Sequence, residues 1–178
     1  MRVIAGKYKG RTLIAPKYDT RPTLDRMKET LFNIINYRLQ DATVLDLFAG
    51  SGQLAIESLS RGAVRAIICD NNRQAVDSIK QNFAKIGITP EIMFCDYNRC
   101  LAEVCCKFDV IFVDPPYKSD YYLSVLNAVC VNDLLNENGI VICEHLAEDD
   151  LPKTVSCLDK YDSRKIGTVM FDFFQRSK

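Results

Sequence analysis

The segment Asp114-Pro115-Pro116-Tyr117 carries the residues best suited to chemistry on an amino group. Two consecutive prolines end the apolar run before them and stiffen the following turn. In a rigid turn, the Asp114 carboxylate and the Pro115 carbonyl can accept both hydrogens of one amine. An amine conjugated to an aromatic ring is a poor nucleophile, and two acceptors would free its lone pair for attack. Tyr117 offers a ring on which a flipped-out base could stack. We therefore predict that Asp114, Pro115, Pro116 and Tyr117 form a catalytic site.

A second segment, residues 44–52, reads as a buried strand that runs into a glycine turn. Gly50 and Gly52 permit backbone angles and close ligand contacts that a side chain would obstruct. Asp46 lies near the carboxyl end of the strand, where open α/β sheets hold their ligands. Asp70 ends another apolar run, and an acid there suits the two hydroxyls of a ribose. The pattern predicts a nucleoside-cofactor site, and the alternative is a tight turn that binds nothing.

Short apolar runs alternate with amphipathic segments along the chain, which predicts a doubly wound α/β sheet. Strands are expected at 44–47, 66–69, 91–95, 108–113 and 140–143, and helices at 24–39, 53–61, 73–86 and 121–131. Between 156 and 176, alternation of apolar residues around Gly167 predicts an antiparallel hairpin. Asp46, Asp70, Asp96 and Asp114 would then end, or nearly end, successive strands.

The first 28 residues are strongly basic, although the formal net charge of the chain is zero. They hold eight lysines and arginines against two aspartates. A hairpin is expected at 2–15 around Gly6 and Gly10, projecting its basic side chains and adding little to the core. Such a charge asymmetry indicates a face that meets phosphates, and the alternative is a solvated arm.

The composition is that of one soluble globular domain, with 178 residues, 48% hydrophobic and 26% charged. We find neither an apolar run near the length that spans a bilayer nor a signal-peptide pattern, and expect a cytoplasmic protein. The cysteines, among them Cys69, Cys95, Cys143 and Cys157, are expected to be reduced and to pack as small apolar residues. With one histidine, His145, and no C-x-x-C motif, we predict no metal site.

Taken in order, Asp46-Leu47-Phe48-Ala49-Gly50-Ser51-Gly52 and Asp114-Pro115-Pro116-Tyr117 resemble the S-adenosylmethionine-dependent class I methyltransferases that act on exocyclic amino groups. Residues 2–6, 10–11, 21–26 and 29–33 narrow the resemblance to the RsmD family, bacterial 16S rRNA guanine-N2 methyltransferases. It covers essentially the whole chain. It implies a Rossmann-like fold: a mostly parallel seven-stranded sheet with helices on both faces, an antiparallel C-terminal hairpin and a small basic N-terminal hairpin.

The resemblance also implies residue roles. The glycine turn with Asp46 would hold the methionine part of S-adenosylmethionine, Asp70 the ribose and Asp96 the adenine amino group, with Tyr97 beside the ring. The predicted cofactor-binding residues are Asp46, Phe48, Ala49, Gly50, Ser51, Gly52, Asp70, Asn71, Asp96, Tyr97 and Asp114. The predicted substrate-binding residues are Arg2, Lys7, Lys9, Arg11, Arg21, Thr23, Arg26 and Tyr117.

The function implied is methyl transfer from S-adenosylmethionine to the N2 amino group of guanine 966 in 16S rRNA. The expected substrate is the 30S subunit or its assembly intermediate, and the expected state is a monomer. Residues 1–23 would be an RNA-contacting extension, and 24–178 the methyltransferase domain.

Three other interpretations stay open at this point. Residues 50–55 also fit the G-x-G-x-x-A pattern of dinucleotide-binding proteins, which alone is a weak signal. A DNA or rRNA adenine-N6 methyltransferase would share the Asp-Pro-Pro-Tyr turn. An RNA-binding protein without catalysis would share the fold, and a titration with the cofactor would test it.

Overall fold

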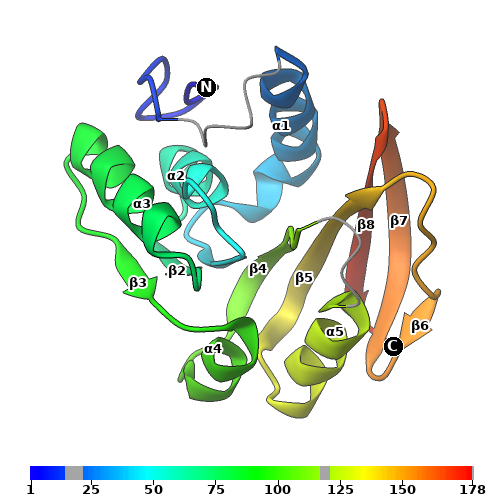
Figure 1. Cartoon of the computed structure of the whole chain (residues 1–178). Coiled ribbons are helices and arrows are strands. Elements are labelled where there is room, and N and C mark those ends of the chain that lie inside the picture. Colours follow the sequence, from blue (N-terminus) through cyan, green and yellow to red (C-terminus); the bar gives the residue numbers. More distant parts are fainter. Residues whose placement is uncertain (15–21, 117–120, 178) are drawn as a thin grey trace.

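The computed structural model describes residues 1–14, 22–116 and 121–177, with the side chains of residues 22–24 outside the description (Figure 1). The helices are α1 (Pro22–Ile35), the 3-10 turn η1 (Asn36–Arg38), α2 (Gln53–Ser60), α3 (Arg73–Ile86), α4 (Tyr97–Glu103) and α5 (Tyr121–Val131). The strands are β1 (Thr43–Leu47), β2 (Arg65–Cys69), β3 (Glu91–Met93), β4 (Phe108–Val113), β5 (Leu135–Leu146), β6 (Thr154–Val155), β7 (Leu158–Ile166) and β8 (Val169–Arg176).

These strands form one sheet in the order β3-β2-β1-β4-β5-β8-β7-β6. The first five are parallel, and β8 pairs antiparallel with both β5 and β7. The seven expected strands are thus present, and the two-residue β6 adds an eighth at one edge. The chain order reverses between the neighbours β1 and β4, where open α/β sheets form a ligand crevice. The predicted Rossmann-like fold is confirmed.

Helices cover both faces of the sheet (Figure 1). One face packs against α1, α2 and α3, and the other against α4 and α5. Side chains alternate along each strand, so Phe112 of β4 meets α1 while Ile111 and Val113 face the α5 side. Both faces of β4 are therefore buried, as its continuous apolar sequence predicts.

Element bounds follow the predictions closely where the apolar pattern is long. The helix at 73–86 and the strand at 108–113 have the expected limits. The short α4 was not predicted, because seven residues hold too few turns for a helical period to show. It begins where Asp96 accepts hydrogen bonds from the backbone N–H groups of Asn98 and Arg99.

The N-terminal segment is packed more closely on the domain than predicted. Val3 and Leu13 are buried in the cluster formed by α2, α3 and β2, so the expectation of little core contribution was wrong. Its ladder is one bridge, between Arg2 and Thr12. Gly6 has φ +80°, and a Cβ there would lie 1.7 Å from the Ser60 carbonyl oxygen. The close approach of this turn to α2 therefore requires glycine.

A buried carboxylate of α2 holds the same segment. Glu57 accepts hydrogen bonds from the backbone N–H groups of Ile4 (2.8 Å) and Ala5 (3.1 Å). Its charge is balanced by Arg61 at 2.8 Å and Lys28 at 3.9 Å. Lys28 is itself buried and donates to the Arg2 carbonyl oxygen, 2.6 Å away. Lys28, one of the eight basic residues counted above, is therefore buried in the fold and does not contribute to the basic face.

Cys130 and Cys157 form a disulfide, so the prediction that Cys157 is a reduced thiol is wrong. The turn between β6 and β7 brings Cys157 against the last turn of α5, with a Cα–Cα distance of 5.8 Å. The six other cysteines, Cys69, Cys95, Cys100, Cys105, Cys106 and Cys143, are free thiols. Among the described helices, none has the length and apolarity needed to cross a membrane.

Candidate active site

The glycine turn after β1 is bound to the end of β2. The Gly50 N–H donates to Asp70 Oδ2 at 2.8 Å, and the Ala49 N–H donates to the Cys69 carbonyl oxygen at 3.0 Å. Gly50 and Gly52 have φ of +55° and +71°, a region that favours glycine. Gly52 also precedes α2 directly as its N-cap. The predicted glycine turn and Asp70 thus lie together at the carboxyl edge of the sheet.

Asp46 lies inside this edge and is buried. Its Oδ2 accepts a hydrogen bond from the Ala55 N–H in the first turn of α2, at 3.0 Å. Burial, together with the nearby charges of Asp114 and Asp70, raises the pKa of Asp46 to about 8, against the lowering effect of the Ala55 hydrogen bond. Three predicted site residues therefore influence one another, and a buried acid with a raised pKa is typical of a functional site.

The acids that follow β2 and β3 also organise the helices next to them. Asp70 Oδ1 accepts from the Asn72 N–H at 2.8 Å, and Asn71 is exposed beside it. Asp96 is exposed, and both of its hydrogen bonds at the start of α4 use Oδ1. Each acid is thus held by backbone N–H groups at a strand end, in a fixed orientation.

Three aromatic rings gather above the turn. Phe48 lies 5.4 Å from Tyr97 and 5.8 Å from Tyr121 between ring centroids, and the two tyrosines are 5.0 Å apart. Phe48 and Tyr97 were predicted, whereas Tyr121 was missed. Its position, just after the Asp-Pro-Pro-Tyr turn, is the signal that could have found it. Such a cluster offers apolar faces to a flat ring.

Ala49, Ser51 and Gly52 are the buried members of the glycine turn. The Ser51 carbonyl oxygen accepts from Asn82 Nδ2 of α3 at 3.0 Å, and Asn82 Oδ1 accepts from the Ile14 N–H at 2.7 Å. Asn82 therefore connects the turn to the N-terminal segment, a contact that no sequence pattern predicts.

Asp114 directly follows β4, the strand between β1 and β5. It is half-buried, Pro115 is buried and Pro116 is exposed. Tyr117 lies outside the described residues. Glu144 stands next to Asp114 on the neighbouring strand, because Val113 pairs with Cys143 in the β4–β5 register. Glu144 was not predicted as a site residue, although it follows an apolar run as Asp70 and Asp114 do.

The predicted substrate residues lie on the N-terminal segment and α1. Arg2, Lys7, Lys9 and Arg11 are exposed on the segment, and Arg26 is exposed on α1. Arg21 and the side chain of Thr23 lie outside the described residues.

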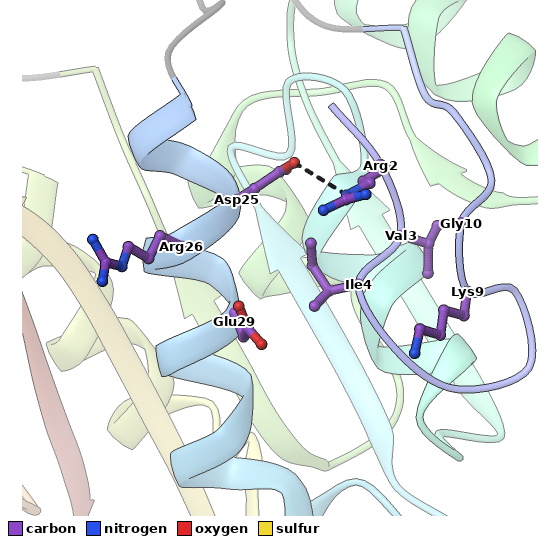
Figure 2. Close-up of a pocket in the computed structure, with 8 residues that line it drawn as sticks. All are labelled: Arg2, Val3, Ile4, Lys9, Gly10, Asp25, Arg26 and Glu29. Atoms are coloured by element: carbon purple, nitrogen blue, oxygen red, sulfur yellow. Dashed lines mark ion pairs between the residues drawn. The ribbon is translucent and has the colours of Figure 1, made fainter.

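A cavity of about 410 Å³ separates the segment from α1, lined by Arg2, Val3, Ile4, Lys9, Gly10, Asp25, Arg26 and Glu29. Figure 2 shows Lys9 and Glu29 extending into the space between the two, while Arg26 points away from the segment. The Nε of Arg2 lies 3.7 Å from Asp25 Oδ2 across the cavity. Three of the predicted basic residues, Arg2, Lys9 and Arg26, thus line a cavity that two acidic residues also line.

A solved structure shares this architecture over the full chain. It is described as "Putative methyltransferase yhhF" from Escherichia coli, with a TM-score of 0.87, 28% identity, and coverage of 100% of this chain and 98% of that one. The strand order and the similarity to this solved structure define the class: the protein has the fold of the Rossmann-like methyltransferases.

The sequence comparisons give the family. The family model described as "Conserved hypothetical protein 95" matches residues 1–175. A Bacillus subtilis protein named "Putative rRNA methyltransferase YlbH" is 39% identical over 164 residues, 89% of each chain. The Escherichia coli K12 protein named "Ribosomal RNA small subunit methyltransferase D" is 30% identical over 178 residues, 99% of this chain and 90% of its own. The chain belongs to the RsmD family of ribosomal RNA methyltransferases.

Proposed function

We propose that this protein transfers a methyl group from S-adenosylmethionine to the N2 amino group of a guanine in 16S rRNA, at position 966. The observation that carries the proposal is Asp114, a half-buried carboxylate at the end of the central strand β4 and close enough to Asp46 to raise its pKa. Family membership supports the ribosomal RNA substrate.

The edge formed by β1, β2 and β3 suits the cofactor. Asp46, the glycine turn with Ala49 and Ser51, Asp70 with Asn71, and Asp96 would hold it, with Phe48 and Tyr97 against its ring. The raised pKa of buried Asp46 supports this assignment, because a cationic group would compensate the ionised carboxylate. When bound, S-adenosylmethionine supplies a methyl group already activated by a positively charged sulfur.

The turn after β4 suits the amine. The Asp114 carboxylate and the Pro115 carbonyl would accept the two hydrogens of the guanine amino group and direct its lone pair. Pro116 would keep the turn rigid, and Tyr117 would stack on the base. A strong base is unnecessary, because the nitrogen becomes acidic once alkylated and its proton leaves late. Alignment then supplies most of the catalysis.

The N-terminal segment, residues 1–23, suits the RNA, with residues 24–178 as the methyltransferase domain. Arg2, Lys7, Lys9 and Arg11 would contact phosphates around the cavity shown in Figure 2, together with Arg21, Thr23 and Arg26. Glu57 and Gly6 fix the segment on α2, so its cations are held in place before RNA binds.

We place this activity in the cytoplasm, in a monomer that uses no metal, acting on the 30S subunit or its assembly intermediate. A flipped guanine must come from an exposed loop or a distorted duplex, which an assembled particle offers.

The test is methyl transfer from labelled S-adenosylmethionine to unmodified 30S subunits, free 16S rRNA and duplex DNA, with the labelled nucleoside identified by mass spectrometry. N2-methylguanosine from a ribosomal substrate is expected, and the preferred substrate shows the assembly state. N6-methyladenine, or no transfer to any substrate, would contradict the proposal.

A further inference from the structure

Glu144 lies beside the proposed catalytic carboxylate. Val113 of β4 pairs with Cys143 of β5 in a parallel register, so Asp114 and Glu144 are the next residues along two neighbouring strands. Both are half-buried. The pKa of Tyr122 is raised mainly by burial, and the charges of Asp114 and Glu144 raise it as well. Two acidic side chains thus face the same small region at the carboxyl edge.

The two acidic residues also line one narrow hollow. Its walls include Leu31 of α1, Leu54 of α2 and Phe171 of β8. As it stands, the hollow has no room for a water molecule, so a base would lie at its mouth. There an aromatic ring would meet apolar walls on one side and both acids at its edge.

The main chain of Glu144 is held firmly. The Tyr122 hydroxyl donates to the Glu144 carbonyl oxygen at 2.8 Å, and Glu144 pairs with Phe171 in the β5–β8 register. A side chain on a paired strand is better fixed in direction than one on a loop. This suits a residue that discriminates between similar bases.

An acceptor pair on an amine does not by itself separate guanine from adenine, because each base has an exocyclic amino group. The neighbouring ring atom does: N1 carries a hydrogen in guanine and a lone pair in adenine. An ionised carboxylate only accepts hydrogen bonds. A second carboxylate next to Asp114 would therefore bind guanine N1–H and repel a lone pair at N1.

We propose that Glu144 accepts the N1–H hydrogen of the target guanine and is the specificity-determining residue of this site. The inference rests on the proposed function, because it requires a guanine amino group at Asp114. It adds the residue that excludes purines whose N1 is an acceptor.

The test uses 16S rRNA made by ligation, carrying guanine or 2-aminopurine at the methylated position, in the assembly state that the wild-type protein prefers. 2-Aminopurine keeps the N2 amino group but has a lone pair at N1. The wild type should methylate it about 10- to 100-fold more slowly than guanine, the usual effect of one mismatched polar contact. Equal rates would overturn the inference without any variant.

The second arm is Glu144→Gln, whose amide can donate to N1 as well as accept from N1–H. It should slow the guanine reaction and shrink the ratio between the two bases by about tenfold. Glu137→Gln, an exposed change on the same strand, should keep the wild-type ratio. If Glu144→Gln binds S-adenosylmethionine normally yet keeps the wild-type ratio, the proposed role of Glu144 is overturned and the proposed function is not. Absence of guanine methylation by the wild type would instead overturn the proposed function, and this inference with it.

Discussion

Two aspartates in this sheet are equally buried, but their pKa values are shifted in opposite directions. Asp46 of β1 and Asp172 of β8 are each 1% exposed. Asp172 contacts Lys160 at 3.0 Å and accepts from the Ser163 hydroxyl at 2.6 Å. Burial raises its pKa, but the contacts with His145, Ser163 and Lys160 outweigh burial, so the pKa is lowered. Asp46 receives one backbone hydrogen bond and lies near two other acids, and its pKa is raised to about 8.

The difference separates an acid whose charge is compensated by neighbouring side chains from an acid that we propose to lie against the cofactor. In the antiparallel half of the sheet, Lys160 and Ser163 contact Asp172 and compensate its negative charge within the fold. In the parallel half, Asp46 lies at the carboxyl edge of the sheet. The nearby charges of Asp114 and Asp70 increase the free-energy cost of ionising it. A cationic ligand would remove that cost, and S-adenosylmethionine carries positive charge.

The largest effect is expected at the parallel half. Asp114→Ala should lower methyl transfer by about 10²- to 10⁴-fold, the usual contribution of a positioned acid–base group. Its affinity for S-adenosylmethionine should stay near that of the wild type. Single-turnover assays with a separate cofactor titration measure both. Asp109→Ala, at the amino end of the same strand, removes contacts to Thr43 and Asn136 and should affect stability rather than the reaction. Wild-type turnover in Asp114→Ala would refute its assignment.

The next effect tests the antiparallel half. Asp172→Asn leaves Lys160 nearly buried without its main anion and should cost about 3 kcal/mol of unfolding free energy in denaturant titrations. Asp150, whose side chain is 97% exposed, is a second carboxylate near Lys160. Asp150→Asn should therefore change the free energy of unfolding little. If both variants unfold alike, the buried pair is not the source of stability.

A smaller effect is a pH dependence that Asp46 imposes on stability. A carboxyl whose folded pKa is raised stabilises the fold fully below its unfolded value, 3.8, and this contribution is lost as the pH rises through about 8. Asp46→Asn should therefore gain about 1–3 kcal/mol over the wild type between about pH 5 and about pH 8. Thermal unfolding at each pH measures the difference. A constant difference would show that Asp46 does not titrate in this range.

The smallest effect belongs to His145, whose ring nitrogens face the Leu146 carbonyl oxygen at 2.9 Å and Asp172 Oδ2 at 3.2 Å. The Nε2 contact lacks hydrogen-bond geometry, and it becomes an ion pair only when the ring is protonated. Burial lowers the pKa of His145, but Asp172 and Leu146 raise it more, and the net shift is upward.

The stability that His145 contributes is present below its unfolded pKa, 6.5, and is lost as the pH rises through the higher folded value. Over that window, the midpoint of thermal unfolding of the wild type should fall slightly more than the titration of Asp46 alone would lower it. In Asp172→Asn this part of the slope should disappear. A slope unchanged in that variant would assign it to another group.

The sequence predicts the parallel half best. Alternating strands and helices place Asp46, Asp70, Asp96 and Asp114 at one edge by topology alone. Glu144 obeys the same rule at the end of an apolar run and could have been found by applying it once more.

Contacts between distant segments were beyond prediction. Glu57 binds the N–H groups of Ile4 and Ala5 across more than 50 residues, and Cys130 meets Cys157 across 27. Neither pair leaves a periodic signal. The burial that raises the pKa of Asp46 likewise depends on packing of the whole fold, which a local pattern does not report.

The central claim is that the carboxyl edge around Asp46 binds a cationic cofactor. Calorimetric titration of S-adenosylmethionine into the wild type and Asp46→Asn, near neutral pH, tests it most directly. We expect one cofactor bound per wild-type chain and an affinity at least about tenfold weaker in Asp46→Asn, a difference of ~1.4 kcal/mol in binding free energy. Equal affinity in the two proteins, or no binding to the wild type, would contradict it.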